Sequence, residues 1–433
     1  MSEASLIVAI LLAVIYWSER GSHGSGRGAK KHGYGDSAIL GVGCVSLLLN
    51  LLRQGKRRGV MRLGTTITGH KYLAPSDSLL VFGPTRSGKT LTLALPLLCE
   101  FAGPAVVTSI KRDLYARSSP ARGKMGETRI FDLSDPDSSS WNLFSLVDDL
   151  RSAKEISDSL CAVSRATNPE IEFWSRLASK MLAPLLLAAK ELGASLAEMV
   201  RWVEVQDFEG AFDALSEAGH YEARSALDAV TRLDERAVSS VVATLFSLME
   251  PYNDPLVSSL LSIDGIDLPR MLDRNDSCTL YICSPLFKAE RFYGVYEVFL
   301  RRVFEIAYSS AANPKILFLL DEIANIAPIS DLGKIASTCG GYGLVLVSVF
   351  QDLAQLSAIY GANAGTIVNN HRSKLLLSGI SDHATLDYVE RIHAWRNERE
   401  TALNPLLELK IGYGLLLQAN AKPIKLRLRP FPR

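Results

Sequence analysis

The sequence has few cysteines, and it lacks the spacings that would make them a metal site or a disulfide framework. Six cysteines occur in 433 residues, and no two form a Cys-x-x-Cys pair. No histidine pair at metal-binding spacing stands near them, and most lie in apolar stretches such as "TLYICSP". This pattern predicts buried free thiols in a reducing compartment. The six are Cys44, Cys99, Cys161, Cys278, Cys283 and Cys339.

The chain also has almost no net charge, because 47 lysines and arginines balance 46 aspartates and glutamates. Global charge therefore gives no indication of a nucleic-acid partner. The charges are nevertheless uneven, since residues 53–62 carry a basic run and no acid follows Glu408. We interpret both stretches as solvated faces, with binding to acidic lipid or nucleic acid as the alternative. With 48% hydrophobic and 21% charged residues, the chain is typical of a folded protein with two or three domains.

No apolar run reaches the length of a standard transmembrane helix. Two shorter runs occupy residues 5–17 and 38–52, and a Gly/Ser-rich stretch separates them. As helices they would span about 20–22 Å, against roughly 30 Å of hydrocarbon. A signal peptide fits poorly because no basic residue precedes residue 5. We predict a membrane-anchor region over residues 1–60, with the following chain in the cytoplasm because of the basic run. Two ordinary buried helices are the alternative.

What the sequence does contain is a phosphate-binding loop. The apolar run "DSLLVF" predicts a strand, "GPTRSG" is the loop, and "KTLTLALPLLCEF" continues as a helix that Pro96 ends or kinks. Amides of such a loop hold phosphate oxygens, Lys89 neutralises the β- and γ-phosphates, and the Thr90 hydroxyl binds Mg²⁺. The predicted nucleotide-binding residues are Gly83, Pro84, Thr85, Arg86, Ser87, Gly88, Lys89 and Thr90.

The next predicted strand argues against a GTPase. The run "GPAVVTSI" ends at Lys111, Arg112 and Asp113, which resembles a guanine-recognition motif. Ile110 stands where that motif needs Asn or Thr, and the position follows too soon after the phosphate loop. Lys111 and Asp113 are instead predicted either to support the nucleotide or to begin a helix.

An acidic pair follows another buried strand. The stretch "KILFLLDEIANI" holds an unbroken apolar run, which is typical of a central parallel strand, and then Asp321 and Glu322. Asp321 is predicted to orient water on Mg²⁺, and Glu322 to act as general base toward the attacking water. Together with the phosphate loop, this pair indicates an NTP-hydrolysing site.

Polar residues also follow two later strands. "GLVLVSVFQD" ends in Gln351, at the place where RecA-like ATPases often carry a residue that senses the γ-phosphate; a helix-capping role is the alternative. Residues 368–379 predict a further strand with Arg372 and Lys374 at its start, which are candidate cations for a neighbouring subunit's site. The predicted catalytic residues are therefore Lys89, Glu322 and Gln351.

The long separation between the phosphate loop and the acidic pair indicates an insertion. Apolar residues recur at helical spacing over residues 145–265, where strand-type alternation is scarce. We predict an α/β, RecA-like P-loop domain with a mainly parallel sheet over residues 61–144 and 266–433, interrupted by an all-α domain. Phe173 and Trp174, in that inserted domain, are predicted to lie in its core.

Several stretches, in order, resemble one family. The sequence is similar from about residue 75 to its end to the coupling ATPases of type IV secretion and bacterial conjugation, the TraG/TraD kind, and its two N-terminal apolar segments match that family's membrane anchor. The stretches that carry the resemblance are "GPTRSGKT", "IFDLSDPDSSSWNLFSLV", "FWSRLASKMLAPLL", "TLYICSP", "LFLLDEIANI", "GGYGLVLVSVFQDLAQLSAIYG" and "NNHRSKLLLSGISDHATLDYV".

The resemblance implies an ATPase that binds ATP and Mg²⁺, is anchored in the bacterial inner membrane with its catalytic domain in the cytoplasm, and assembles as a homo-oligomeric ring, commonly a hexamer. It implies that the ring receives a DNA–relaxase complex or an effector protein and passes it to components of a secretion channel. By position, Lys89 and Thr90 correspond to the phosphate and Mg²⁺ residues, Asp321 and Glu322 to the acids, and Gln351 to the sensor.

The sequence departs from the family at one functional position. Members often carry an arginine finger before the Gln351 strand, where this chain has Gly340 and Gly341. Arg372, Lys374 or Arg274 are candidate replacements. Two alternatives to a coupling ATPase stay open at this point: a double-strand DNA translocase of the FtsK kind, and a nucleotide-binding docking scaffold without turnover.

Overall fold

The computed structural model describes residues 61–66, 69–73, 78–161, 169–285, 290–396, 405–418 and 421–430. The two predicted membrane segments, residues 5–17 and 38–52, and Cys44 lie outside these residues. No helix in the described part of the chain is both long enough and apolar enough to cross a bilayer. Residues 59–433 form one compact unit.

The centre of this unit is an eleven-stranded sheet with the order β2-β1-β11-β10-β9-β3-β8-β7-β4-β6-β5. All neighbours from β9 to β5 are parallel, and those from β2 to β9 are antiparallel. The prediction of a mainly parallel sheet is therefore confirmed. The strands are β1 (Met61–Thr66), β2 (Gly69–Leu73), β3 (Leu79–Phe82), β4 (Ala105–Ser109), β5 (Thr128–Phe131), β6 (Thr279–Cys283), β7 (Ile316–Asp321), β8 (Leu344–Phe350), β9 (Ser373–Leu377), β10 (Tyr413–Gln418) and β11 (Ile424–Arg427).

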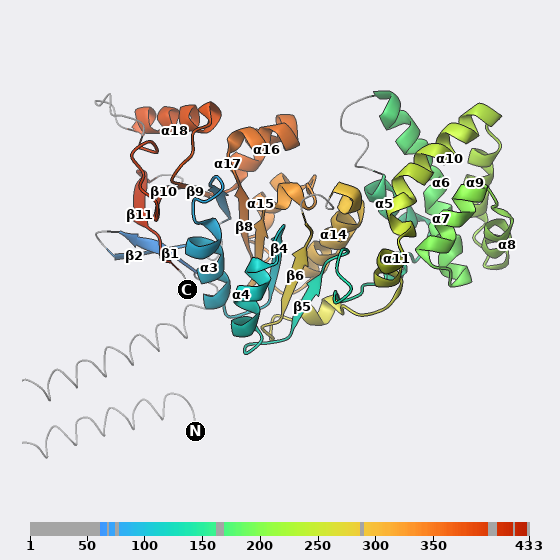
Figure 1. Ribbon diagram of the computed structural model, residues 1–433, viewed down its shortest axis with the longest axis horizontal. Helices are drawn as coiled ribbons and strands as arrows, with labels where there is room; N and C mark the ends of the chain where they lie inside the picture. The colour runs from blue at the N-terminus through green and yellow to red at the C-terminus, as the bar shows by residue number, and fades with distance from the viewer. Residues whose placement is uncertain are drawn as a thin grey trace, which may run out of the picture. The chain divides into compact units, whose positions relative to one another are not determined.

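The parallel strands are apolar throughout because helices cover both faces of the sheet. Leu79 and Val81 of β3 point into a core with α3 and α4, whereas Leu80 and Phe82 point into a larger core on the other face, which includes α14 and α15. Figure 1 shows these helices beside the strands. The covering helices are α3 (Leu95–Glu100), α4 (Asp113–Arg122), α14 (Tyr293–Ser309), α15 (Leu332–Thr338), α16 (Leu353–Tyr360), α17 (Ala364–Asn370) and α18 (His383–Arg396).

Between β5 and β6 the described chain is helical, as the 3.6-residue periodicity predicts. The long helix α6 is apolar over most of its second half and packs against α5, α8, α9 and α10, which Figure 1 draws around it. The hydrophobic core of this helical region is continuous with the larger of the two cores that flank the sheet. The helices are α5 (Leu150–Leu160), α6 (Pro169–Leu192), α7 (Leu196–Val205), α8 (Glu209–Glu217), α9 (Tyr221–Thr231), α10 (Glu235–Met249), α11 (Pro255–Ser262) and α12 (Leu268–Met271).

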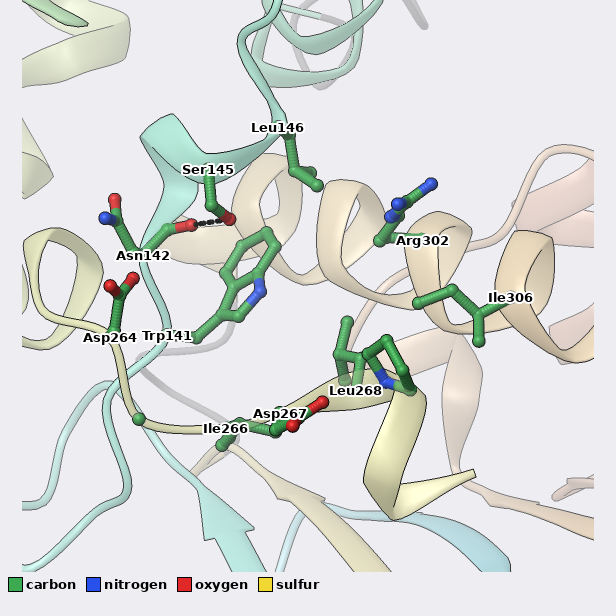
Figure 2. Close-up of a pocket in the computed structure, with 12 residues that line it drawn as sticks. Trp141, Asn142, Ser145, Leu146, Asp264, Ile266, Asp267, Leu268, Arg302 and Ile306 are labelled. Carbon is green, nitrogen blue, oxygen red and sulfur yellow. Dashed lines mark hydrogen bonds between the residues drawn. The ribbon is translucent and has the colours of Figure 1, made fainter. Parts of the chain in front are cut away.

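The chain's entry to this helical region and its exit are hydrogen-bonded to one another. The Trp141 amide donates to the Leu260 carbonyl (2.7 Å), and the Ile266 amide donates to the Ser140 carbonyl (2.9 Å). A hollow of about 330 Å³ lies beside this crossing. Figure 2 shows it between Trp141, the exit segment and the α14 side chains Arg302 and Ile306. The two connections between the sheet and the helical region are therefore hydrogen-bonded to each other. The exact domain boundaries stay a prediction.

Two expectations about side-chain burial have different outcomes. Cys161, Cys278, Cys283 and Cys339 are buried and Cys99 is half-buried, and none of these five described cysteines is in a disulfide. Phe173 was predicted to lie in the core, and this prediction is wrong, because its side chain is 55% exposed. It lies in the first turns of α6, where one face of the helix still projects from the bundle; the adjacent Trp174 packs partly buried against the core.

Candidate nucleotide site

The phosphate loop lies where the sequence places it, between β3 and a helix. The loop turns through positive φ at Arg86 (67°) and Gly88 (91°). The helix begins with a π-helical turn, η1 (Thr90–Ala94), and continues as α3. Pro96 neither ends nor sharply breaks it: because proline has no amide hydrogen, the wider turn just before it accommodates the missing hydrogen bond.

Gly83 opens the loop at a point where no side chain fits. A Cβ on Gly83 would lie 2.8 Å from Ser87 Oγ and 2.9 Å from Leu377 Cδ1. The Gly83 amide donates to the Phe350 carbonyl (3.1 Å), which joins the loop to the end of β8. The loop is therefore held against both neighbouring strands, β8 and β9, with a cradle that depends on glycine.

Lys89 is buried at the centre of the site. Its Nζ donates to the Gly83 carbonyl (2.7 Å) and lies 3.9 Å from Glu322 Oε1. The structure thus brings together the predicted phosphate-binding lysine and the predicted general base, although the sequence separates them by a whole helical region. Parallel strands explain this meeting, because their carboxyl ends share one edge of the sheet.

Asp321 and Glu322 stand at the end of β7 in different environments. Asp321 is almost fully buried, and its backbone carbonyl accepts a hydrogen bond from Thr108 Oγ1 (3.0 Å). Glu322 is half-buried and adopts a left-handed backbone conformation, with φ of 51°. Such a conformation costs free energy for a non-glycine residue and is typical of functional turns.

The electrostatics of Asp321 favour a bound cation. Burial, with the negative charge of Glu322 as a smaller cause, raises the pKa of the Asp321 carboxyl from 3.8 to about 7. Lys89 opposes this pKa shift, and Asp113 adds to it. A divalent cation at Asp321 would hold the carboxylate ionised at neutral pH.

The buried side-chain oxygens without a hydrogen-bond partner among the described residues include one of the phosphate loop and two of the acidic pair: Ser87 Oγ, Asp321 Oδ1 and Glu322 Oε2. Orphaned buried polar atoms are uncommon in folded proteins. Two of them are carboxylate oxygens, the ligand type that Mg²⁺ prefers. Together with the Gly83 cradle and the Lys89 ammonium, this donor set fits Mg²⁺ and a polyphosphate.

Other predicted residues lie around this centre. Gln351 directly follows Phe350, whose carbonyl binds the Gly83 amide, so it stands beside the loop. The backbone amide of Gln351 donates to the side-chain Oε1 of Gln355 (2.8 Å), near the start of α16. Thr90 is half-buried in the first turn of the helix. Asp113 begins α4, and its Oδ1 accepts a hydrogen bond from the Leu114 amide (3.1 Å). Of the two roles predicted for Asp113, this position is the one at the start of a helix.

The proposal that Arg274 replaces the arginine finger is wrong. Its side chain is 6% exposed, and its guanidinium is held by buried oxygens of its own subunit. Desolvation lowers its pKa from 12.5. The acceptors are Ser310 Oγ (2.8 Å) and the carbonyls of Pro314 (2.6 Å), Tyr342 (2.9 Å), Ala307 (3.0 Å) and Gly343 (3.2 Å).

The other two candidate cations stand at the edge of the sheet opposite the phosphate loop. Arg372, which is exposed, immediately precedes β9, and Ser373 pairs with Leu79 at the start of β3. Lys374, which is half-buried, pairs with Leu80. The Gly340–Gly341 turn precedes β8 at this same edge.

The chain is similar to two curated proteins of conjugation and DNA transfer systems. Conjugal transfer protein TraG of Escherichia coli is 23% identical over 332 residues, covering 68% of this chain and 52% of TraG. Protein VirD4 of Agrobacterium fabrum is 23% identical over 392 residues, covering 82% of this chain and 54% of VirD4. The chain thus spans about half the length of these curated relatives.

Solved structures share the fold at low sequence identity. Plasmid coupling protein TrwB, in complex with ADP and Mg²⁺, has a TM-score of 0.65 and 17% identity, covering 83% of this chain and 86% of TrwB. VirB4 of Thermoanaerobacter pseudethanolicus has a TM-score of 0.56 and 11% identity, covering 86% and 97%. The family model described as type IV secretory system conjugative DNA transfer matches residues 52–392. With most of its length matched, the chain belongs to this type IV secretion conjugative DNA transfer family.

Proposed function

We propose that this chain is an ATP-driven coupling protein, which recruits DNA–relaxase complexes or protein substrates and feeds them to a type IV secretion or conjugation channel. Membership of the conjugative DNA transfer family supports the cargo and the channel as partners. The likeness to TrwB, whose structures include complexes with an ATP analogue and with ADP and Mg²⁺, supports the nucleotide. The alternative of an FtsK-like translocase has no such support.

One observation carries the catalytic part of the proposal. Lys89 Nζ contacts the Gly83 carbonyl and Glu322 Oε1, and buried oxygens of the loop and of the acidic pair have no hydrogen-bond partner among the described residues. A structural ion pair would satisfy its own hydrogen bonds, as buried polar networks do. These groups instead keep capacity for a ligand that offers both negative oxygens and a divalent cation.

The chain's own residues divide the work of hydrolysis. When bound, Mg²⁺-ATP supplies the transferable phosphoryl group and the counter-charge at its oxygens. Lys89 binds β- and γ-phosphate oxygens, and Thr90 and Asp321 hold the metal. Glu322 takes the proton of the attacking water on a carboxylate oxygen, and Gln351 reports the γ-phosphate to α16, which its amide already contacts through Gln355.

We extend the proposal to assembly and location. The RecA-like core forms a homo-oligomeric ring, as a hexamer, in which one subunit's cation completes the next subunit's site. Residues 1–60 anchor the ring in the bacterial inner membrane, with the described residues in the cytoplasm. DNA in such a ring is bound chiefly through its phosphates, so its retention falls steeply between low and moderate salt.

Two variants test this function. Lys89→Ala is expected to abolish ATP binding, because it removes the cation for the β- and γ-phosphates. Glu322→Gln keeps the shape of the site and is expected to bind ATP normally while turnover falls about 10²–10⁴-fold, the range for loss of a general base. Calorimetry measures binding, and phosphate release from the assembled protein with DNA measures turnover.

The matched control is Glu235→Gln, an exposed glutamate at the start of α10, which should leave both quantities unchanged. Cargo that co-purifies with the Glu322→Gln protein identifies the substrate, since ATP and cargo are held together when hydrolysis stops. A wild-type ring that binds ATP but never hydrolyses it, with DNA or with protein substrate, would instead establish the docking scaffold.

A further inference from the structure

The hollow of about 330 Å³ beside the crossing of the two connections has no part in the nucleotide site. Its lining combines residues between 141 and 146 of the entry, residues 264–269 of the exit, and the α14 side chains Arg302 and Ile306 (Figure 2). Its volume is within the range of ligand pockets. The apolar residues of the lining are Trp141, Leu146, Ile266, Leu268, Pro269 and Ile306.

The Trp141 indole is buried, and its N–H has no hydrogen-bond acceptor among the described residues. The residue is only 3% exposed. Figure 2 shows the indole nitrogen facing the hollow. Because buried indole N–H groups usually find an acceptor, an occupant that offers a carbonyl oxygen would satisfy this donor.

The rim of the hollow is acidic. Asp264 and Asp267 are exposed on the exit connection. A smaller hollow of about 170 Å³ adjoins the first, since the two share Ser145, Leu146 and Arg302. Both α14 arginines in the lining are already paired with glutamates of their own helix. Positive charge on an occupant is therefore favoured here. The carboxylates that line the two hollows are Asp148, Glu155, Asp264, Asp267 and Glu305.

One segment of the chain carries the complementary chemistry. Residues 429–433 read Arg-Pro-Phe-Pro-Arg, an aromatic residue between prolines and two arginines, and no acid occurs after Glu408. Phe431, Pro432 and Arg433 lie outside the described residues. Proline offers a carbonyl acceptor without an N–H, and basic proline-containing segments dock in grooves lined by aromatic side chains. The segment thus matches the hollow in apolar character, hydrogen bonding and charge.

This segment cannot reach the hollow of its own subunit. Leu428 is buried, and its amide donates to the Gly412 carbonyl (2.8 Å). Phe431 follows three residues later, which span at most about 11 Å. The Trp141 ring contacts that of Phe131, the last residue of β5 (centroids 6.1 Å apart). β11 and β5 have seven strands between them, so they lie roughly 38 Å apart across the sheet.

We propose that residues 430–433 of one copy of the chain dock in this hollow of a second copy. Phe431 packs on the apolar floor, and a main-chain carbonyl of the segment accepts from the Trp141 N–H. Arg433 pairs with Asp264 at the rim. The contact is heterologous, because it joins opposite ends of the sheet in two copies, and such contacts build rings when the rotation closes. The inference rests on the homo-oligomer proposed above.

Two variants of the full chain test the apolar and hydrogen-bonding parts of the contact. Phe431→Ser removes the ring and is expected to raise the dissociation constant of the oligomer at least about tenfold. Trp141→Phe keeps an aromatic ring in the hollow but removes the N–H, and is expected to raise it about three- to tenfold. Sedimentation velocity measures association, and thermal melts show that both variants are folded.

A charge swap tests the rim without touching a buried side chain. Asp264→Arg and Arg433→Asp should each weaken association, because each places like charges together. Combined in one chain, they should restore most of the wild-type affinity. Asp213→Arg, at an exposed aspartate on α8, is the matched control and should change nothing. Single variants without effect, or a swap that restores nothing, would overturn the pairing.

Photo-cross-linking locates the contact directly. p-Benzoylphenylalanine at position 431, in a mixture of unlabelled and isotope-labelled protein, should join one chain to residues 141–146 or 264–269 of another. Cross-links within one chain or to a different surface would overturn the proposal. An oligomer insensitive to Phe431→Ser and Asp264→Arg would overturn this contact alone and leave the hollow to a basic segment of another protein. A wild type that stays monomeric at every concentration, with and without Mg²⁺-ATP, would overturn the homo-oligomer as well.

Discussion

The phosphate-loop edge of the sheet and the two buried arginines, Arg122 and Arg274, are alike in burial and opposite in hydrogen bonding. Arg122 is fully buried, and its guanidinium donates to Thr279 Oγ1 (2.7 Å) and to the carbonyls of Phe101 (2.5 Å), Gly103 (2.7 Å) and Ser277 (3.0 Å). At the phosphate-loop edge, by contrast, oxygens of Ser87, Asp321 and Glu322 have no partner among the described residues.

The difference indicates which buried charges hold the fold and which are kept for a ligand. A buried guanidinium surrounded by carbonyls stabilises only the protein that it ties together. Buried carboxylates without partners destabilise the protein until a ligand arrives. Burial alone therefore does not identify a functional charge, and the completeness of its hydrogen bonds does.

The largest effect on stability should come from removing a buried arginine whose hydrogen bonds are complete. Arg122→Ala leaves several buried acceptors unpaired, so we expect the free energy of unfolding to fall by about 3–5 kcal/mol. Arg176→Ala is the matched control, because Arg176 forms an exposed ion pair with Glu172 on α6, worth at most about 0.5 kcal/mol. Chemical denaturation measures both. Equal effects of the two variants would contradict the comparison.

At the phosphate-loop edge, removing a buried charge should raise the free energy of unfolding instead of lowering it. The raised pKa of Asp321, about 7 against 3.8, means that the wild type loses stability as pH rises through this window. Without ligand, Asp321→Asn should therefore be more stable than the wild type above pH 7, by roughly 2–4 kcal/mol, and no more stable below about pH 4.

Mg²⁺-ATP should reverse the relative stability of the wild type and Asp321→Asn. Mg²⁺-ATP is expected to raise the melting temperature of the wild type more than that of Asp321→Asn, because the variant has lost a metal ligand. Thermal melts at pH 5 and pH 8, with and without Mg²⁺-ATP, measure both effects. A gain from Asp321→Asn that is the same at the two pH values would show that the carboxyl does not titrate in this window.

The smallest of these effects concerns the exposed edge opposite the phosphate loop. Arg372 is exposed at this edge and is the candidate cation that we test there. Arg372→Ala should lower turnover at least about tenfold without weakening ATP binding. Mixing with Glu322→Gln subunits, which keep Arg372, should restore turnover at Arg372→Ala sites. Failure to complement would place the finger elsewhere, and Arg291→Ala, in a surface ion pair with Glu250, serves as control.

Local patterns predicted much of the site. The strand, loop and helix around Gly83–Thr90 lie within one short stretch, and the apolar runs of β4, β6, β7 and β8 are each buried on both faces, so their composition alone marks them. The acidic pair then had to meet the loop, because both follow parallel strands.

Long-range pairing was not predictable in the same way. β1 pairs with β11, and Thr65 and Arg427 face each other across 362 positions of sequence. The short strands β1, β2, β10 and β11 carry no motif, so the antiparallel extension of the sheet was missed. Phe173 was assigned to the core because it is apolar, yet exposure depends on which face of α6 the neighbouring helices cover.

The sequence by itself determined the chemistry available to this protein: a phosphate loop, an acidic pair and a helical region between them, because each is encoded by neighbouring residues. The tertiary structure decided how those groups are used. It buried Asp321 Oδ1 without a hydrogen-bond partner among the described residues, committed Arg274 to carbonyls, and brought residues 406–411 beside Ser87. These outcomes depend on which distant backbone and side-chain atoms share one desolvated space, and no local pattern specifies that.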